Sequence, residues 1–502
     1  MNLSKSILLG SVAGLITLAG AHAADLPVKA KAVEYVKTCA LYGAGFYYVP
    51  GTDTCLKLGG YTRALLQVNS NSMSLNPDFG VGGATNRFSN AYTWRARQAL
   101  SVDTRTATDY GLVRTYAEAW FTWTSGSYSG AGDGSTIYQG APGGAVAGGT
   151  LQFMYAFIQF AGFTFGKAQS QFSLPWGEYP GNFVELPGSS AWDPVNQFTY
   201  TADFGQGITA SFSVQDQVQH DTSNIWNVSA ATPAGLVTGA YGGNDIAGTA
   251  APDLIAMVRI DQAWGLFQAS LAAHDNHAAY YGATEFTGHP DDKWGWAGQL
   301  GLSIKNIPTG PGDSINLSGV YANGASRYTF NDYLPATYAR YGGTSLAGAY
   351  QSVGLAGLSD SVFVAGAGQQ LTTTFGFNGA YNHNWDSRWA SSIFGGFGAV
   401  RYNSTAKSYI CGAFVGALAL SSGIAGYNPD FNYAVVGTKT SWTPVKNLTF
   451  MAEVDYSRLD QKYASGSTVV LPQQLVIGKP AAAYQLKDQS SLGFQLLVQR
   501  NF

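Results

Sequence analysis

"AYTWRARQALSV", residues 91–102, decides the fold because apolar and polar side chains alternate along it. Successive side chains of a β-strand point to opposite faces, so a period of two indicates a strand whose two faces meet different surroundings. One face is apolar and carries aromatic rings, whereas the other is basic. The apolar face carries Tyr92, Trp94, Ala96, Leu100 and Val102, and the basic face carries Arg95, Arg97 and Ser101.

The same division recurs along the chain. Residues 112–123 place Phe121 and Trp123 on an apolar face and Arg114 and Glu118 on a polar one. About sixteen strands are predicted in this way, an even number, as in bacterial membrane barrels. Their ranges are 56–69, 91–103, 111–123, 151–160, 163–170, 196–204, 207–216, 253–262, 265–274, 293–304, 313–322, 370–383, 388–402, 431–442, 447–459 and 489–502.

The segments between the predicted strands alternate between short and long. Short ones such as "GQG", "AWG" and "NWDS" are rich in turn residues. Eight long ones would then share one end of a barrel, with the short turns and both termini at the other. A soluble sandwich has no reason for this alternation. The long segments are 70–90, 124–150, 170–195, 217–252, 274–292, 323–369, 403–430 and 461–487.

Composition supports a membrane barrel over a soluble or nucleic-acid-binding protein. Charged residues make up 11% of the chain and aromatic residues 14%, and the formal net charge is -3 without a basic run. No nucleic-acid partner is therefore expected. Aromatic residues near strand ends would form the girdles at the membrane surfaces, although each could instead pack a soluble core. They are Tyr92, Trp94, Trp120, Trp123, Trp294, Trp296, Phe450 and Tyr456.

The first 23 residues are predicted to be a secretory signal peptide. An apolar stretch follows Lys5, and the small residues before Ala24 suit cleavage between Ala23 and Ala24. The best remaining candidate for a membrane helix is residues 411–426, which are too short and too rich in glycine to span. An exported chain of this kind is either a secreted β-rich protein or an outer-membrane barrel, and the strands favour the barrel.

Three cysteines follow the predicted signal peptide. Cys39 and Cys55 would close a short loop as a disulfide, which export permits, and a metal site is the alternative although no histidine lies nearby. Cys411 is predicted to be a free, loosely packed thiol.

The stretch "VEYVKTCALYGAGFYYVPGTDTCLKLGGYTR", residues 33–63, resembles the N-terminal signature of the general porins of alphaproteobacteria. The matching motifs are V-E-Y-V-K-x-C, Y-G-x-G, the aromatic pair before "PGT", and T-C-L-K followed by G-Y-x-R. Beyond it, the similarity is one of layout and of the final Phe502. The resemblance also supports a bridge between Cys39 and Cys55, because both lie in the shared motifs.

This resemblance implies a 16-stranded homotrimeric barrel that passes small hydrophilic solutes and ions across the outer membrane. Residues 24–55 would form a periplasmic or lumenal segment and residues 56–502 the barrel. The third long loop, residues 170–195, would fold into the lumen and present an acidic side to a basic barrel wall. Its acidic residues are Glu178, Glu185 and Asp193.

The parity of the strands places arginines on the inward faces. Facing acids on a folded-in loop, they would set a transverse field that orients dipolar solutes and sets ion preference. Alternatively, each arginine only satisfies carboxylates and carbonyls of a polar lumen. The predicted basic wall comprises Arg63, Arg95, Arg97, Arg114 and Arg259. Separately, the small residues of 393–400 would contact a neighbouring subunit or mark barrel curvature.

Two other functional classes compete with a channel. No catalytic triad, H-E-x-x-H pair or phosphate-binding loop stands in a persuasive context, so neither an enzyme nor a cofactor is expected. His274 and His277 flank Asp275 and leave a metal site open, with solvated loop residues as the favoured interpretation. A non-conducting adhesin or structural barrel is the second rival, and its lumen should be plugged and apolar.

The last strand, "SLGFQLLVQRNF" (residues 491–502), also alternates. Leu492, Phe494, Leu496 and Val498 would face lipid, and Leu497 is an apolar exception on the polar face. This strand is predicted to close the ring by pairing with residues 56–69, which removes an edge that lipid would not tolerate. Phe502 resembles the terminal aromatic signal that outer-membrane assembly machinery reads.

Overall fold

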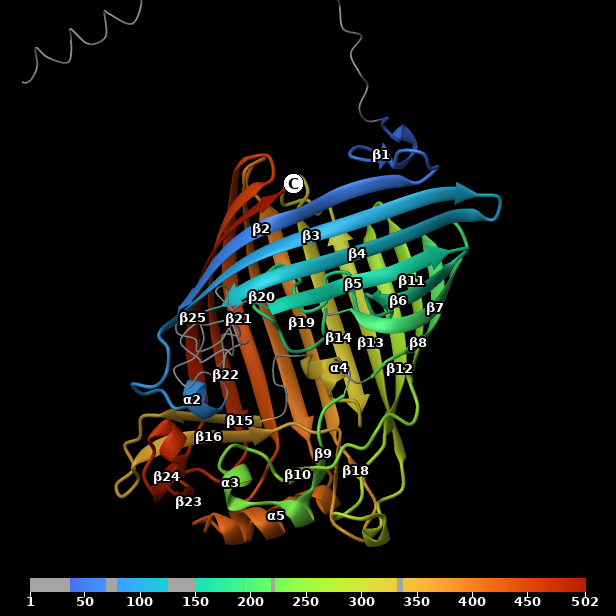
Figure 1. The fold of residues 1–502 in the computed structure, drawn as a ribbon. Coiled ribbons are helices and arrows are strands. Elements are labelled where there is room, and N and C mark those ends of the chain that lie inside the picture. The colour runs from blue at the N-terminus through green and yellow to red at the C-terminus, as the bar shows by residue number, and fades with distance from the viewer. Residues whose placement is uncertain (1–36, 69–78, 125–149, 193, 218–221, 332–336) are drawn as a thin grey trace, which may run out of the picture.

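The computed structural model describes residues 37–68, 79–124, 150–192, 194–217, 222–331 and 337–502. Sixteen antiparallel strands form a closed barrel (Figure 1). They are β2 (Cys55–Val68), β3 (Tyr92–Thr108), β4 (Gly111–Thr124), β5 (Thr150–Phe160), β6 (Phe163–Ala168), β7 (Val195–Asp203), β8 (Ile208–Gln215), β11 (Asp253–Gln262), β12 (Gly265–Asn276), β13 (Lys293–Lys305), β14 (Ser314–Asn323), β19 (Thr373–Asn384), β20 (Trp389–Arg401), β21 (Phe431–Val445), β22 (Leu448–Gln461) and β25 (Gln489–Asn501).

The predicted barrel and its strands are confirmed, because each predicted range overlaps one of the sixteen barrel strands. The alternation divides the wall as expected. In β3, Tyr92 and Leu100 are exposed on the outside, whereas Thr93 is buried on the inner face. None of the helices among the described residues is long and apolar enough to cross a membrane.

The seam of the barrel lies between β2 and β25. These strands pair from Val68 opposite Phe494 to Tyr61 opposite Asn501, as predicted. The backbone N–H of Phe502 donates to the carbonyl of Gly60 (3.1 Å), so the last residue extends this pairing. The ring therefore has no open edge.

The long loops gather at one end of the barrel, opposite the C-terminus and β1 (Tyr47–Tyr48) (Figure 1). No strands or helices were predicted within them. They contain two four-stranded sheets, each with one parallel pair, and several short helices. The elements are β9 (Ile225–Asn227), β10 (Gly243–Asn244), β17 (Ser361–Phe363), β18 (Gln370–Leu371), β15 (Thr337–Gly342), β16 (Gln351–Gly357), β23 (Thr468–Leu471), β24 (Ala482–Leu486), α2 (Gly80–Gly83), α3 (Pro233–Leu236), α4 (Arg327–Phe330), α5 (Ser404–Ala417), η4 (Val228–Ala230), η5 (Glu285–Thr287), η6 (Ile424–Gly426) and η7 (Leu475–Ile477).

The largest hydrophobic cluster joins these loops to the adjacent barrel ends. Trp226 and Phe414 are buried in it together with Phe394 and Tyr433 of β20 and β21. Cys411 lies on α5 and is a free thiol as predicted, but it is buried rather than loosely packed. Burial raises the pKa of its thiol. The loop end of the barrel is therefore a packed structure with its own core.

At the opposite end, Cys39 and Cys55 form the predicted disulfide rather than a metal site. The bridge ties η2 (Ala40–Tyr42) and β1 to the start of β2. Both cysteines pack against Phe46. The predicted signal peptide and cleavage site lie outside the described residues, as do residues 24–36 that follow them.

Candidate functional site

The loop between β6 and β7 contacts strands on several sides of the barrel interior. The Nε2 of Gln268 on β12 lies 3.1 Å from the carbonyl of Ser173 and also reaches the two preceding carbonyls. Further along, Asn316 of β14 donates to the carbonyl of Pro180 (2.6 Å). Asn378 of β19 donates to the hydroxyl of Ser189 (3.0 Å). Side-chain amides on these strands thus satisfy loop carbonyls that would otherwise need water.

Glu453 on β22 holds the middle of the same loop. Its carboxylate oxygens accept hydrogen bonds from the backbone N–H groups of Phe183 (2.5 Å) and Val184 (2.7 Å). Gln495 of β25 donates to the same carboxylate (3.3 Å), and Glu453 is fully buried. Bonds from backbone N–H groups to a carboxylate are among the stronger hydrogen bonds in proteins. Glu453 was not among the predicted site residues.

Glycines on the inner faces of the strands leave room for the loop. A Cβ atom at Gly396 would lie 2.7 Å from the carbonyl oxygen of Pro187. One at Gly398 would lie 3.2 Å from the Pro187 side chain, and one at Gly376 would lie 2.9 Å from the Cα of Gly188. The glycines of 393–400 were predicted to serve a subunit contact or barrel curvature. Two of them instead accept the loop inside the barrel.

Leu497, the apolar exception of the last strand, is explained by the same loop. It is buried with Leu65 of β2 and Met451 of β22 in one cluster, and Phe183 of the loop packs against this cluster. These residues form an apolar surface, on an otherwise polar inner face, against which the loop packs. The loop is thereby fixed by both hydrogen bonds and packing.

Arginines lie on the wall formed by β2, β3 and β4. Arg63 and Arg97 are direct cross-strand partners, and Arg95 is two residues further along β3. The Nε of Arg63 donates to Gln499 (2.7 Å) and that of Arg97 to Thr122 (2.9 Å). Both of these acceptors are neutral, and across the described part of the chain neither guanidinium forms an ion pair. Their charges are therefore not cancelled by a bonded carboxylate.

Aromatic rings connect this basic wall to the loop. The guanidinium carbon of Arg97 lies 3.8 Å from the ring centre of Trp120, which stacks on Trp192 of the loop with ring centres 6.1 Å apart. Arg63 lies 5.1 Å from the ring centre of Phe183. Trp120 was predicted to belong to the membrane girdle. That prediction was wrong, because its indole N–H donates to Glu118 (2.6 Å) on the inner face.

Arg114 and Arg259 stand apart from the other arginines. Arg114 donates to Asp103 through two nitrogens, each at 3.1 Å, and Arg105 binds the same carboxylate. Arg114 is the cross-strand partner of Arg105, and Arg105 lies eight residues, or about 26 Å, from Arg97 along β3. Arg259 lies on β11 and donates to Gln268 (2.9 Å). The structure therefore brings together three of the five predicted arginines.

The predicted loop acids have different surroundings. Glu178 is buried, and its carboxylate accepts from the backbone N–H of Trp192 (3.3 Å) within the loop. Glu185 is half-buried. Asp193 lies outside the described residues. Glu178 thus helps to shape the loop from within.

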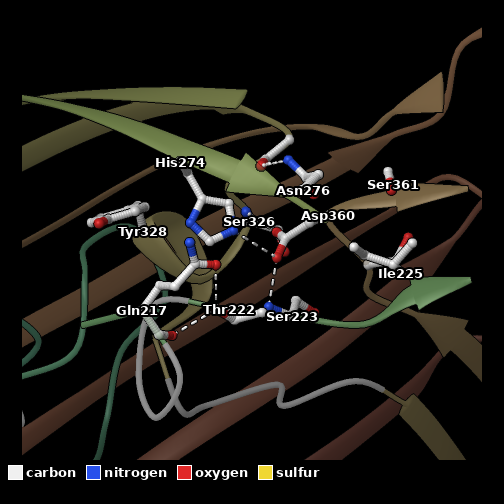
Figure 2. Close-up of polar contacts among 12 residues, drawn as sticks. Gln217, Thr222, Ser223, Ile225, His274, Asn276, Ser326, Tyr328, Asp360 and Ser361 are labelled. Atoms are coloured by element: carbon white, nitrogen blue, oxygen red, sulfur yellow. Dashed lines mark hydrogen bonds and ion pairs between the residues drawn. The ribbon is translucent and has the colours of Figure 1, made fainter. Parts of the chain in front are cut away.

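His274 belongs to a buried network at the loop end of the barrel. Its Nδ1 lies 2.8 Å from Asp253. Its Nε2 lies on the side of Asp360, at 3.6 Å, as Figure 2 shows for these two residues. Asp360 also accepts from the backbone N–H groups of Ser223 and Ser326, each at 2.5 Å. Solvation in a loop was the favoured interpretation of His274 and is wrong, because the side chain is 1% exposed. The network joins two loops, the one between β8 and β11 and the one between β14 and β19, to β11 and β12.

Comparison with known proteins agrees with this geometry. A family model described as "Porin subfamily" matches residues 25–494. The chain belongs to this porin subfamily. Porin Omp2a of Brucella melitensis is 35% identical over 262 residues, which is 50% of this porin and 66% of the relative. Porin Omp2a of Brucella ovis is 34% identical over 266 residues, with 50% and 70% covered.

A solved structure also shares the fold. The outer membrane channel DcaP of Acinetobacter baumannii has a TM-score of 0.57 at 12% identity, covering 91% of this porin and 99% of that chain. At this identity the likeness concerns the fold alone. Family membership and the closed barrel together make the protein a porin channel of the outer membrane. They indicate a channel rather than an enzyme.

Proposed function

We propose that this porin lets small hydrophilic solutes and ions diffuse passively through a water-filled lumen, and that it favours anions. The observation that carries the proposal is the pairing of Arg63 and Arg97 on the wall that faces the anchored loop. Two adjacent guanidinium groups without a bonded carboxylate require water around them and create a positive potential. Arg95 lies next to them on β3, and its Nε donates to Thr124 (2.9 Å).

The loop between β6 and β7 would narrow the lumen at this level. Its contacts to β12, β14, β19 and β22 support a fixed position across the barrel. Glu178 and Glu185 would contribute to the potential of the loop side, and the paired Arg114 would act mainly in structure. The partners implied are the outer-membrane lipid bilayer and small solutes. We also propose a homotrimer, and recognition of Phe502 by the outer-membrane assembly machinery, from the family resemblance.

A salt gradient across a planar bilayer tests the anion preference. Replacing Arg95 and Arg97 with glutamine should move the reversal potential toward cation preference, because two positive charges leave the patch. Arg458→Gln is a matched control, since Arg458 is exposed near the loop end of β22 and pairs with Asp488 (2.8 Å). A reversal potential that is the same in the double variant and the wild type would contradict the proposed role of the basic wall.

A non-conducting adhesin or structural barrel remains the alternative function. It would have a closed lumen, whereas arginines and amides line the inner faces found here. Insertions that carry no current would favour the adhesin.

A further inference from the structure

Outside the barrel interior, Asp275, His277 and Asp292 converge at the end of the hairpin formed by β12 and β13. One potential ligand atom from each residue lies within 4.8 Å of those of the other two. The Nδ1 of His277 lies 2.7 Å from a carboxylate oxygen of Asp292. His274 is not part of this group, because both of its nitrogens face other carboxylates.

The strand register explains why these side chains meet. Asn276 pairs with Lys293, so His277 and Asp292 are the next opposing positions at the base of the loop. Asp275 and His277 are two residues apart and share one face of the hairpin. This face is the outer one. Leu271 has the same parity as Asp275 and Trp294 pairs with Asp275, and both of these side chains are exposed. The group therefore lies on the outside of the rim, on rigidly paired strands.

The charge of this group is not balanced by the rest of the described chain. Asp275 is 5% exposed, and its Oδ1 atom has no hydrogen-bond partner. No lysine or arginine among the described residues forms an ion pair with Asp275 or Asp292. The nearby Lys293 donates instead to the carbonyl of Gln369 (3.1 Å). A buried carboxylate without a partner is unfavourable, and a bound cation would remove that cost.

Space for further ligands adjoins the group. A cavity of about 280 Å³ is lined by Asp275 and His277 on one side and by residues 246–250 on the other. The backbone N–H of Ala247 donates to the carbonyl of His277 (3.0 Å), which fixes this covering segment. Water molecules could complete a coordination shell from this side.

We propose that Asp275, His277 and Asp292 form a binding site for a divalent transition-metal ion that clamps the base of the loop 277–292. One imidazole and two carboxylates are a donor set that suits ions such as Zn²⁺ better than Ca²⁺ or Mg²⁺, which prefer oxygen alone. Three protein ligands leave at least one position for water. The ion would join β12 and β13 where their backbone ladder ends.

Titration calorimetry with Zn²⁺ on the purified, chelator-treated porin in detergent tests the site. We expect one Zn²⁺ per chain. Asp275→Asn and His277→Gln should each weaken Zn²⁺ binding by at least the roughly tenfold that changing a residue behind the metal ligands costs. Asp292→Asn should do the same without altering a buried side chain, because Asp292 is 42% exposed. His289→Gln is the matched control, since His289 lies in the same loop and bonds to the Pro290 carbonyl.

Hydrogen exchange provides a second readout that does not depend on calorimetry. Zn²⁺ should slow exchange in residues 277–292 of the wild type and of His289→Gln, but not in the three site variants. Absence of Zn²⁺ binding to the wild type would overturn the proposal. Equal binding by the wild type and Asp292→Asn would overturn it as well, and so would loss of binding in His289→Gln.

Discussion

Replacing the carboxyl group of Glu453 by an amide should loosen the loop between β6 and β7. The carboxylate accepts from the N–H groups of Phe183 and Val184 at 2.5 and 2.7 Å. In Glu453→Gln, the single amide oxygen is neutral and the amide NH₂ group faces donors. About one charge-assisted hydrogen bond is lost, which is worth about 2 kcal/mol. Since 1.4 kcal/mol corresponds to a factor of ten, local opening should increase roughly 30-fold.

Hydrogen exchange at Phe183 and Val184 measures this opening directly. The two amides should exchange roughly 30-fold faster in Glu453→Gln than in the wild type, and single-channel currents should become noisier. Glu285→Gln, an exposed change on η5 in another loop, should alter neither quantity. Unchanged exchange at Phe183 and Val184 would refute the view that Glu453 anchors the loop.

Three further predictions concern the ends and the loops of the barrel. Cys39→Ser should lower stability by about 2 to 4 kcal/mol, measured by urea unfolding, because the bridge between residues 39 and 55 is lost, and equal unfolding midpoints would contradict this. Deleting Phe502 should reduce the yield of folded barrel in outer membranes on heat-shift gels before it changes conductance, and a normal yield would count against an assembly role. Although burial raises the pKa of Asp360, hydrogen bonds from His274, Ser223 and Ser326 outweigh it, so the pKa is lowered from 3.8. The ionised carboxylate stabilises the loops fully above the pKa that Asp360 has in the unfolded chain. Hydrogen exchange at the Ser223 amide should therefore accelerate in the wild type as the pH falls below that value, but not in Asp360→Asn.

The strands could be predicted from the sequence because successive side chains of each strand face lipid and the polar lumen in turn. The same parity rule placed Arg63, Arg95 and Arg97 correctly on one wall. Trp120 has the parity of Glu118, so the same rule applied to it would have indicated the inner face, where the structure places it, rather than the predicted membrane girdle. Alternation along a strand was the more reliable signal.

The loops and the loop anchor could not be predicted from local patterns. The parallel pairing of β16 with β24 joins Gln351 to Tyr484, which are far apart in sequence. Glu453 looks like any inward polar residue until the loop is placed on it. Its parity with Asp455 and its position opposite Lys439 and Gln495 were the available signals. They indicate a polar inner face without revealing which backbone groups it binds.

Conductance of the purified wild-type porin in a planar lipid bilayer tests the central claim most directly. A closed barrel with a hydrated, arginine-lined lumen predicts stable open steps whose size grows with salt concentration, and a reversal potential in a salt gradient on the anion-selective side. Folded barrels that insert without carrying current would contradict the account.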